Sequence, residues 1–551
     1  MKTSDIKSLN PVILKLLKNR GISKEEDIIE FLSDKPQKTY DPFLLSGLEA
    51  GVDLLLSAIK NEEKICIYGD YDADGITSTS ILMEFLSKLT HKVEYYIPSR
   101  FSEGYGMNTA AVKKIHDRGA QVIVTVDCGS VSPKEVEYAK ELGMKVIVTD
   151  HHSITDVKSD CIVINPKQEE CKYPFPHLAG CGVAFKLAQG IQKKANLPKS
   201  YINELLDIVS IGTIGDIVPL VDENRTLVKH GMNILNSGRR QSIARFVSGI
   251  SLTEGTIKSD QVSFAIVPHL NAAGRMKDAK IGVELFTAKD KKTIDEKVGL
   301  LAKYNQERKN IQEEAYQNCV QIVEENHKRD DFIVIHGEDI HEGIAGIVAG
   351  KLKDKYQRPV MLLVDSEEGI LKGTGRSIPK VDLYEILKKQ EELFTKFGGH
   401  QGACGLSMAR ENLKKLRAGL QEEIKHKLEE DPQLFNMDKD VDMIIEGKDI
   451  TLPFAMELET LGPFGEANPK PYFALNEVKV VKPFPMGKEG THLRFTAKCP
   501  DGALVECILF GKAQEVVDII YSDNLVNLTG SVQFQEWRGK KKVQFLVDTM
   551  I

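Results

Sequence analysis

The sequence lacks several features that would assign it quickly to a class of protein. Among its 551 residues, no apolar run approaches the ~20 residues that a membrane-spanning helix needs. Residues 1–5 lack the apolar core of a signal peptide, so we expect a cytoplasmic location and no membrane partner. The nine cysteines form no CxxC pair, and Cys161, Cys171 and Cys181 are too widely spaced for a zinc knuckle. Ordinary reduced thiols are therefore expected.

The sequence also lacks an excess of basic residues. It has 73 Lys and Arg against 80 Asp and Glu, a net charge of −7, which argues against a broadly basic coat for nucleic acid. A local basic channel remains compatible with this total, because carboxylates gathered around a metal ion would make it acidic. With 42% hydrophobic and 28% charged residues, the composition is that of a globular protein. The length corresponds to about three or four domains.

Short apolar strands alternate with amphipathic helices in the first third of the chain. The strand-like runs are at 64–69, 92–97, 121–126, 145–149 and 161–164, and helical segments lie at 76–89, 109–118 and 133–142. This alternation is typical of a parallel sheet covered on both faces, which is a doubly wound α/β domain. In such sheets, ligands bind outside the carboxyl ends of the strands.

Side chains that can bind metal ions follow three of these strands. They are Asp70, Asp72 and Asp74 after the first strand, Asp127 after the third, and Asp150, His151 and His152 after the fourth. Asp and Gly are ordinary turn residues, but clustered carboxylates raise the folding free energy unless a cation or a buried partner neutralises them. A calcium-binding EF-hand is excluded, because the twelfth residue counted from Asp70 is Ile81 and not Glu. The convergence of three strand ends at one edge therefore predicts a metal site.

The types of these residues favour particular ions. Asp216 lies in an otherwise apolar stretch, where it either makes a local hydrogen bond or acts as a further ligand. Oxygen and nitrogen ligands without sulfur favour Mn²⁺ or Mg²⁺ over structural zinc. Four or more carboxylates exceed what one ion needs, so two ions bridged by Asp127 are expected. Two such ions are typical of phosphoryl transfer, in which they stabilise the attacking and leaving oxygens. In that reaction we expect His152 to contact the scissile phosphate and Asp150 to orient an imidazole.

The middle of the chain contains a helical connector and a second α/β unit. Residues 268–276 are interpreted as a small-residue turn that presents one cation, and residues 277–330 as a long helical connector. Two glycine-rich stretches, 372–377 and 397–403, are interpreted as loops in which Arg, Thr and His form an anion cradle. Phosphate binding is the function that these parts indicate.

The last part of the chain is rich in strands. About eighty residues of short strands between 472 and 547 fit a small closed barrel of the OB type, a common platform for single-stranded nucleic acid. The segment 537–542 joins the only Trp to a basic hairpin, which is either a solvated turn or a stacking and phosphate contact. The expected domains are a helical segment 1–50, a catalytic domain 51–276, a connector 277–330, a second α/β domain 331–455 and a barrel 456–551.

The motifs resemble those of a known superfamily. Asp150-His151-His152, together with the acidic residues before and after it, resembles the DHH phosphoesterase superfamily, and residues 398–400 resemble the motif of the companion DHHA1 domain. The order of parts is similar to that of the bacterial RecJ family of single-stranded-DNA-specific exonucleases. The stretches that carry this resemblance are 69–75, 103–106, 271–276, 373–377 and the OB-like segment with Trp537.

The resemblance implies Mn²⁺- or Mg²⁺-dependent hydrolysis of single-stranded DNA from the 5′ end, with release of mononucleotides, in DNA repair and recombination. It also brings a helicase and a single-strand-binding protein into consideration as partners. The metal ligands that it implies are Asp72, Asp74, Asp127, His151 and Asp216, with Asp70 close by. Expected substrate contacts are Arg100, Arg275, Thr374, Arg376, Ser377, His400, Trp537 and Lys540. Tyr68 departs from the family pattern, which has a His there, so Asp70 or water is expected to replace that ligand.

Two other functions remain open from the sequence. One is a DHH-family phosphodiesterase that acts on short oligonucleotides or cyclic dinucleotides, or a pyrophosphatase, although a strand-binding barrel would serve no purpose with such small substrates. The other is a replication scaffold that keeps the fold without catalysis. Every ligand position of the motifs except that of Tyr68 is occupied, which favours an enzyme.

Overall fold

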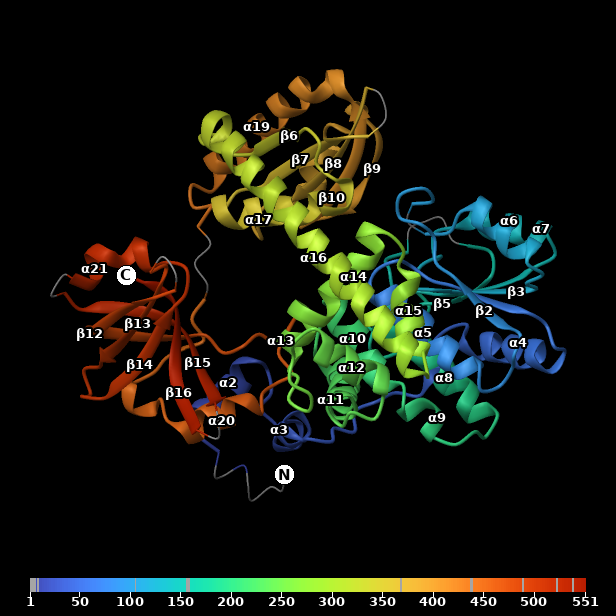
Figure 1. Cartoon of the computed structure of the whole chain (residues 1–551), viewed down its shortest axis with the longest axis horizontal. Helices are drawn as coiled ribbons and strands as arrows, with labels where there is room; N and C mark the ends of the chain where they lie inside the picture. Colours follow the sequence, from blue (N-terminus) through green and yellow to red (C-terminus); the bar gives the residue numbers. More distant parts are fainter. Residues whose placement is uncertain are drawn as a thin grey trace. The chain divides into compact units, whose positions relative to one another are not determined.

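The computed structural model describes residue 6 and residues 9–104, 106–154, 159–366, 369–436, 440–487, 490–521, 524–537 and 540–551 (Figure 1). The chain forms two compact units, one of residues 1–270, 282–296 and 440–551, the other of residues 271–281 and 297–439. The boundaries of the five expected domains stay a prediction. No helix in the described parts of the chain is long and apolar enough to cross a membrane.

A five-stranded parallel sheet in the order β2-β1-β3-β4-β5 forms the centre of the first unit. Its strands are β1 (Ile65–Tyr68), β2 (Val93–Tyr96), β3 (Val122–Val126), β4 (Lys145–Thr149) and β5 (Ile162–Ile164). Helices α6 (Thr109–Asp117) and α7 (Pro133–Glu141) cover one face, and α4 (Leu48–Lys60), α5 (Ala73–Leu86) and α8 (Gly180–Lys194) the other (Figure 1). Strands β1 and β3 are buried along their whole length, as expected for a sheet covered on both faces. The doubly wound fold is confirmed.

A series of helices follows this sheet along the chain. They are α9 (Ser200–Asn203), α10 (Leu206–Gly215), α11 (Asp222–Asn236), α12 (Gln241–Gly249), α13 (Ser259–Gln261), the π-helix η2 (Val262–Ile266), α14 (Val267–Met276) and α15 (Lys280–Thr287). The interpretation of 268–276 as a turn was wrong. Leu270, Ala272 and Ala273 are buried, so this small-residue segment is a packed helix. The expected helical connector is confirmed mainly by α16 (Lys291–Ile322), which the π-helix η3 (Val323–His327) extends.

A mixed sheet in the order β6-β7-β8-β10-β9 forms the core of the second unit. The strands are β6 (Ile333–Gly337), β7 (Val360–Asp365), β8 (Ile370–Arg376), β9 (Phe394–His400) and β10 (Ala403–Ala409), with helices α17 (Glu342–Tyr356), α18 (Leu383–Lys388) and α19 (Leu413–Glu430). The glycine-rich stretches lie mostly within β8 and β9, so their interpretation as loops was wrong. Gly373 and Gly375 face Leu406 and Leu383 so closely that a Cβ would stand 2.9 and 2.7 Å from those side chains. Packing, and not a turn, requires these two glycines.

Five strands close into the expected barrel at the end of the first unit. Strands β12 (Phe473–Met486), β13 (His492–Lys498), β14 (Leu504–Leu509), β15 (Val526–Trp537) and β16 (Lys540–Met550) pair in a ring, since β12 also pairs with β15. The short strand β11 (Met443–Ile444), the helix α20 (Leu452–Glu459) and α21 (Val517–Tyr521) accompany the ring. Helices α2 (Pro11–Asn19) and α3 (Glu25–Leu32) pack into the same hydrophobic core as the barrel. The N-terminal segment is therefore helical, as expected.

Candidate metal centre

The strands β1, β3 and β4 are neighbours in the sheet, so their carboxyl ends bring the predicted ligands together. Asp70 follows β1, Asp127 follows β3, and His151 follows β4 by two residues. Asp216 arrives from elsewhere, because it is the C-cap of α10. Asp127 has a φ of 62°, a strained conformation for a non-glycine residue that is common at functional sites.

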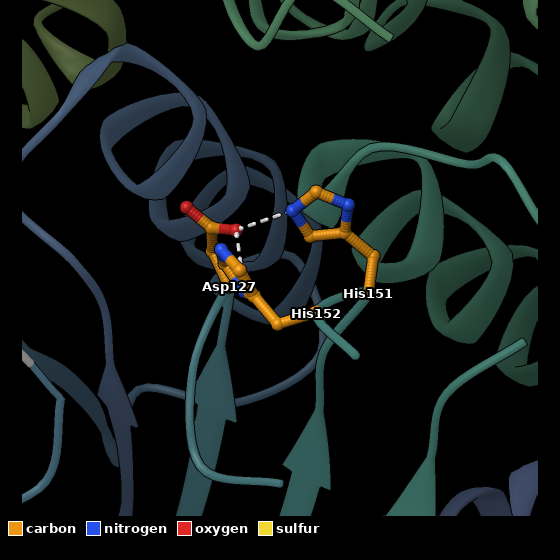
Figure 2. Close-up of side chains that lie close together, drawn as sticks. All are labelled: Asp127, His151 and His152. Atoms are coloured by element: carbon orange, nitrogen blue, oxygen red, sulfur yellow. Dashed lines mark ion pairs between the residues drawn. The ribbon is translucent and has the colours of Figure 1, made fainter. Parts of the chain in front are cut away.

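Three overlapping groups of side chains could each hold a metal ion. They are Asp127 with His151 and His152, Asp74 with His151 and Asp216, and Asp70 with Asp72 and Asp127, with the ligand atoms of each group within 4.8 Å of one another. Nε2 of His151 lies 3.1 Å from Oδ1 of Asp127 and 3.4 Å from Oδ2 of Asp216. Figure 2 shows ion-pair contacts from the Asp127 carboxylate to the imidazoles of both His151 and His152. Asp127 and His151 each belong to two of the groups, and of these two a carboxylate has the two oxygens that a bridging ligand needs.

Burial and mutual repulsion set the protonation of this cluster. Burial, and then the neighbouring carboxylates, hold the pKa of Asp70 and of Asp127 well above the usual range. The same causes raise the pKa of Asp74 to about 6 and that of Asp216 to about 9. Burial lowers the pKa of His151 to about 3, so its imidazole is neutral, as a metal ligand must be. A bound divalent cation would offset the repulsion between these carboxylates, because each of them would be attracted to it.

Several polar atoms of the cluster are buried without a hydrogen-bond partner among the described residues. They are Oδ1 of Asp70, Oδ1 of Asp127, Nε2 of His151 and Oδ2 of Asp216. Such atoms are costly to bury unless something binds them, and here they converge on one place. Oxygen ligands with one imidazole and no sulfur are the set that Mn²⁺ and Mg²⁺ accept. The residues therefore fit these ions.

Backbone groups at the start of α8 hold Asp74 in place. The N–H groups of Gly180 and Cys181 donate to its two carboxylate oxygens at 2.6 and 2.9 Å. Gly180 also lies against Asp127, since a Cβ on Gly180 would stand 2.6 Å from Oδ1 of that residue. Asp72 caps α5, because its Oδ1 accepts from the N–H groups of Asp74 and Gly75. Sequence reasoning missed the contribution of Gly180, for which the only signal was its place in the small-residue run 179–182.

Asp150 and His152 form a pair at the edge of the cluster. Oδ1 of Asp150 lies 2.8 Å from Nδ1 of His152 and accepts from the backbone N–H of His151, while Oδ2 accepts from Ser130. Burial opposes ionisation of both side chains, but their mutual hydrogen bond raises the pKa of His152 and lowers that of Asp150. The His152 side chain is 46% exposed. Asp150 is thus placed to orient this imidazole.

Tyr68 takes no part in the cluster. Its ring is fully buried and stacks on Tyr96 with a centroid distance of 5.7 Å, and its hydroxyl donates to the carbonyl of Gly106 at 2.9 Å. The phenol belongs to the hydrophobic core under α6 and α7. Asp70 is the residue that places an oxygen in the cluster near this strand end.

The predicted phosphate-contacting residues fall into separate places. Arg100 lies over the ring of Tyr71, with 5.2 Å between its Cζ and the ring centroid, and its charge offsets a small part of the rise in the pKa of Asp70 that burial and Asp72 cause. Arg275 donates to the carbonyl of Gly343 at 2.9 Å. Ser377 is buried and its hydroxyl donates to the carbonyl of Val381 at 2.8 Å, so its structural role is to fix the chain after β8. Its role as a substrate contact stays a prediction.

Arg376 and His400 lie in one row across the second sheet. Both pair with Ala403, Arg376 from β8 and His400 from β9, so the three side chains project from the same face. Thr374 lies on that face two residues before Arg376, opposite Gly405. His400 is exposed. The result is a strip of small residues bordered by a cation on one side and an imidazole on the other.

The barrel carries exposed aromatic rings that sequence reasoning missed. Phe484 is 58% and Phe510 52% exposed. The guanidinium of Arg494 lies over the Phe484 ring at 5.6 Å, and His492 packs edge-on against Phe510 at 5.2 Å. These residues come from β12, from β13 and from the position directly after β14, so they share the outer face of adjacent strands. Trp537 and Lys540 are paired at the ends of β15 and β16, but their side chains lie outside the described residues, as do residues 538–539.

Comparisons with known proteins agree with this arrangement. The family models for the DHH family N-terminal domain, the DHHA1 domain and the RecJ OB domain match residues 64–213, 329–426 and 441–549. The single-stranded-DNA-specific exonuclease RecJ of Escherichia coli is 31% identical over 100% of this chain and 97% of its own length. The chain belongs to the RecJ family. RecJ of Bacillus subtilis is 36% identical over 98% of this chain and 68% of its own length.

A solved structure of RecJ from Thermus thermophilus in complex with Mn²⁺ matches the fold with a TM-score of 0.82. The match has 26% identity and covers 99% of this chain and 76% of that one. The same relative has been solved in complex with Mg²⁺. The similarity to RecJ proteins, in sequence and in fold, thus covers nearly the whole chain.

Proposed function

We propose that this protein is a single-stranded-DNA-specific 5′-to-3′ exonuclease that releases mononucleotides with the help of two Mn²⁺ or Mg²⁺ ions, in DNA repair and recombination. The observation that carries the proposal is the set of buried, unpartnered ligand atoms around Asp127 and His151. The names of the relatives and the metal ions in the solved Thermus thermophilus structures support it. A cytoplasmic location and action with a helicase and a single-strand-binding protein belong to the same proposal.

The metal-binding residues in this proposal are Asp70, Asp72, Asp74, Asp127, His151 and Asp216. Asp127 would be the residue that both ions share, since it belongs to two of the ligand groups. When bound, such ions lower the pKa of a water molecule and stabilise the charge that develops on the phosphate oxygens. Asp74 is fixed by the N–H groups of Gly180 and Cys181, so the ligand set is held before an ion arrives.

His152 binds the scissile phosphate in this proposal. Asp150 holds its Nδ1, which orients the ring and favours the protonated form. An imidazolium with one ring nitrogen fixed can donate from the other to a phosphate oxygen. The His152 side chain is partly exposed, whereas that of His151 is buried. This difference is consistent with a His152 that contacts substrate and not an ion.

The remaining substrate contacts divide between the two units. Arg376, Thr374 and His400 contact the DNA backbone across the strip of small residues, where a sugar-phosphate chain can approach the sheet closely. Arg100 and Arg275 provide further positive charge. On the barrel, Phe484 and Phe510 act as stacking platforms for bases, with Trp537 and Lys540 at the β15–β16 tip as a further contact.

One assay separates this function from its alternatives. The protein and Mn²⁺ are incubated with long single strands labelled at either end, with dinucleotides and with pyrophosphate, and the Asp127→Asn variant serves as the control. We expect labelled mononucleotides from the 5′ end of long strands, and none with the variant. Exclusive hydrolysis of dinucleotides or pyrophosphate would support a small-substrate phosphodiesterase. Binding of single strands without turnover in any metal would support a scaffold.

A further inference from the structure

The segment that leads into the barrel is clamped by the catalytic part of the same unit. We call residues 462–469 the barrel-entry turn. Nη2 of Arg225, on α11, donates to the carbonyl of Gly462 at 2.7 Å. Oγ of Ser259, on α13, donates to the carbonyl of Phe464 at 2.7 Å. The turn is therefore fixed to two of the helices that follow the parallel sheet.

The barrel-entry turn also contacts the loop that follows Asp216. The N–H of Leu220 donates to the carbonyl of Glu466 at 2.8 Å. The Leu220 side chain is 2% exposed and lies against Gly465, where a Cβ would stand 2.7 Å from its Cδ1. Only three residues separate Asp216 from Leu220, so the turn contacts the chain close to a proposed metal ligand.

The residue directly after Asp216 is strained. Ile217 has a φ of 57°, in the left-handed region that β-branched residues rarely adopt. Its side chain is 66% exposed, so its own packing does not hold this conformation. Its N–H donates to the carbonyl of Ile214 at 3.4 Å, so the end of α10 restrains it on one side and the loop beyond it on the other. There, the carbonyl of Pro219 accepts from Nδ2 of Asn224 at 3.0 Å, and the barrel-entry turn fixes Leu220.

We propose that the barrel-entry turn holds the metal ligand Asp216 in position, with Gly465 and Leu220 as positioning residues. The inference rests on the metal role of Asp216 in the proposed function. This arrangement joins the barrel to the metal centre through the contacts of Leu220 with the turn and the short segment 217–219. A substitution that displaces the turn should change the affinity of the protein for Mn²⁺. Because coupling between two sites is reciprocal, Mn²⁺ binding should in turn stabilise the barrel-entry turn.

The test measures Mn²⁺ binding to the metal-free full-length protein by titration calorimetry, without DNA. Gly465→Ala is expected to weaken Mn²⁺ binding about threefold and Gly465→Val about tenfold or more, because the new side chain displaces Leu220. Single-strand binding in EDTA should stay unchanged, which shows that the barrel is folded. Gly447→Ala is the matched control: its Cβ would stand 2.6 Å from Sγ of Cys499 in the barrel core, without contact to Leu220.

A second substitution tests the role of the strained residue. Glycine adopts a positive φ without strain, so Ile217→Gly should restore part of the Mn²⁺ affinity of Gly465→Val. The inference is overturned if Gly465→Val binds Mn²⁺ as tightly as the wild type, or if Gly447→Ala weakens binding equally. Should Gly465→Val not fold, Gly465→Ala decides. A wild type that binds no Mn²⁺ would instead overturn the proposed function, and this inference with it.

Discussion

Gly180 offers a sharp test of the metal centre, because it touches two proposed ligands without being one. Its N–H donates to Asp74, and its Cα faces Asp127. In Gly180→Ala, the added Cβ would stand 2.6 Å from Oδ1, 2.8 Å from Cβ and 2.9 Å from Cγ of Asp127. Since ordinary contacts are about 3.5 Å or longer, Asp127 must withdraw by on the order of 1 Å.

The expected size of the effect follows from this displacement. A misplacement of about 1 Å in a reacting constellation costs roughly 100-fold in turnover, which corresponds to about 2.7 kcal/mol. Loss of a supporting contact typically lowers metal affinity about 10- to 100-fold. Gly180→Ala should therefore weaken Mn²⁺ binding and slow hydrolysis by comparable factors. Its thermal stability without metal should change little, because alanine is the better helix former.

Gly182→Ala is the matched control in the same helix. There the new Cβ would meet only Leu178, at 3.3 Å or more, so a small adjustment accommodates it. We expect this variant to keep Mn²⁺ affinity and turnover within about twofold of wild type, with up to about 1 kcal/mol of added stability. Calorimetric Mn²⁺ titration, single-strand hydrolysis and thermal melts in EDTA check both variants. Equal Mn²⁺ affinity in the two variants would refute the reasoning.

Three further outcomes are expected. Lys186 and Glu223 form a fully buried ion pair at 2.5 Å. Lys186→Met should therefore lower the free energy of unfolding in urea by about 3–5 kcal/mol, and adding Glu223→Gln should recover much of that loss. A loss below about 1 kcal/mol in Lys186→Met would contradict this. The double variant Phe484→Ala and Phe510→Ala should bind long single strands about 10-fold or more weakly in fluorescence anisotropy, while its cleavage of short oligonucleotides stays unchanged. An equal loss in strand binding and in short-oligonucleotide cleavage would count against a stacking surface. Asp127→Asn should melt at a higher temperature than wild type in EDTA, because the substitution removes one of several repelling carboxylates. With saturating Mn²⁺, the wild type should melt at the higher temperature. If the variant still melts higher with Mn²⁺, that result argues against a metal role of Asp127.

The sequence predicted the metal centre as far as local rules could reach. Parallel strands put their carboxyl ends on one edge, so Asp70, Asp127 and His151 had to meet once the strands were recognised. Asp216 was predicted only from its apolar surroundings and the family resemblance, because a helix end brings it to the edge. The contact of Gly180 with Asp74 joins residues 106 positions apart, which no local pattern reveals.

The errors have physical causes of the same kind. Glycine in β8 was interpreted as a sign of loops, whereas Gly373 and Gly375 are small because Leu406 and Leu383 pack against them. The aromatic surface of the barrel was missed because the pairing of β12 with β13 shifts between Val481 and Phe484. A bulge of this kind changes which residues of a strand face outward, so strict alternation in the sequence does not show it.

The triplet at the end of β4 shows how three adjacent residues can have three different surroundings. Asp150 turns its carboxylate to the backbone N–H groups of Ser130 and His151 and to the ring of His152. His151 is buried among carboxylates and neutral, whereas His152 is exposed and favoured in its protonated form. One imidazole therefore suits a metal ion and the next a phosphate. This difference arises from surroundings and not from residue type, and it explains why the order of these three residues matters.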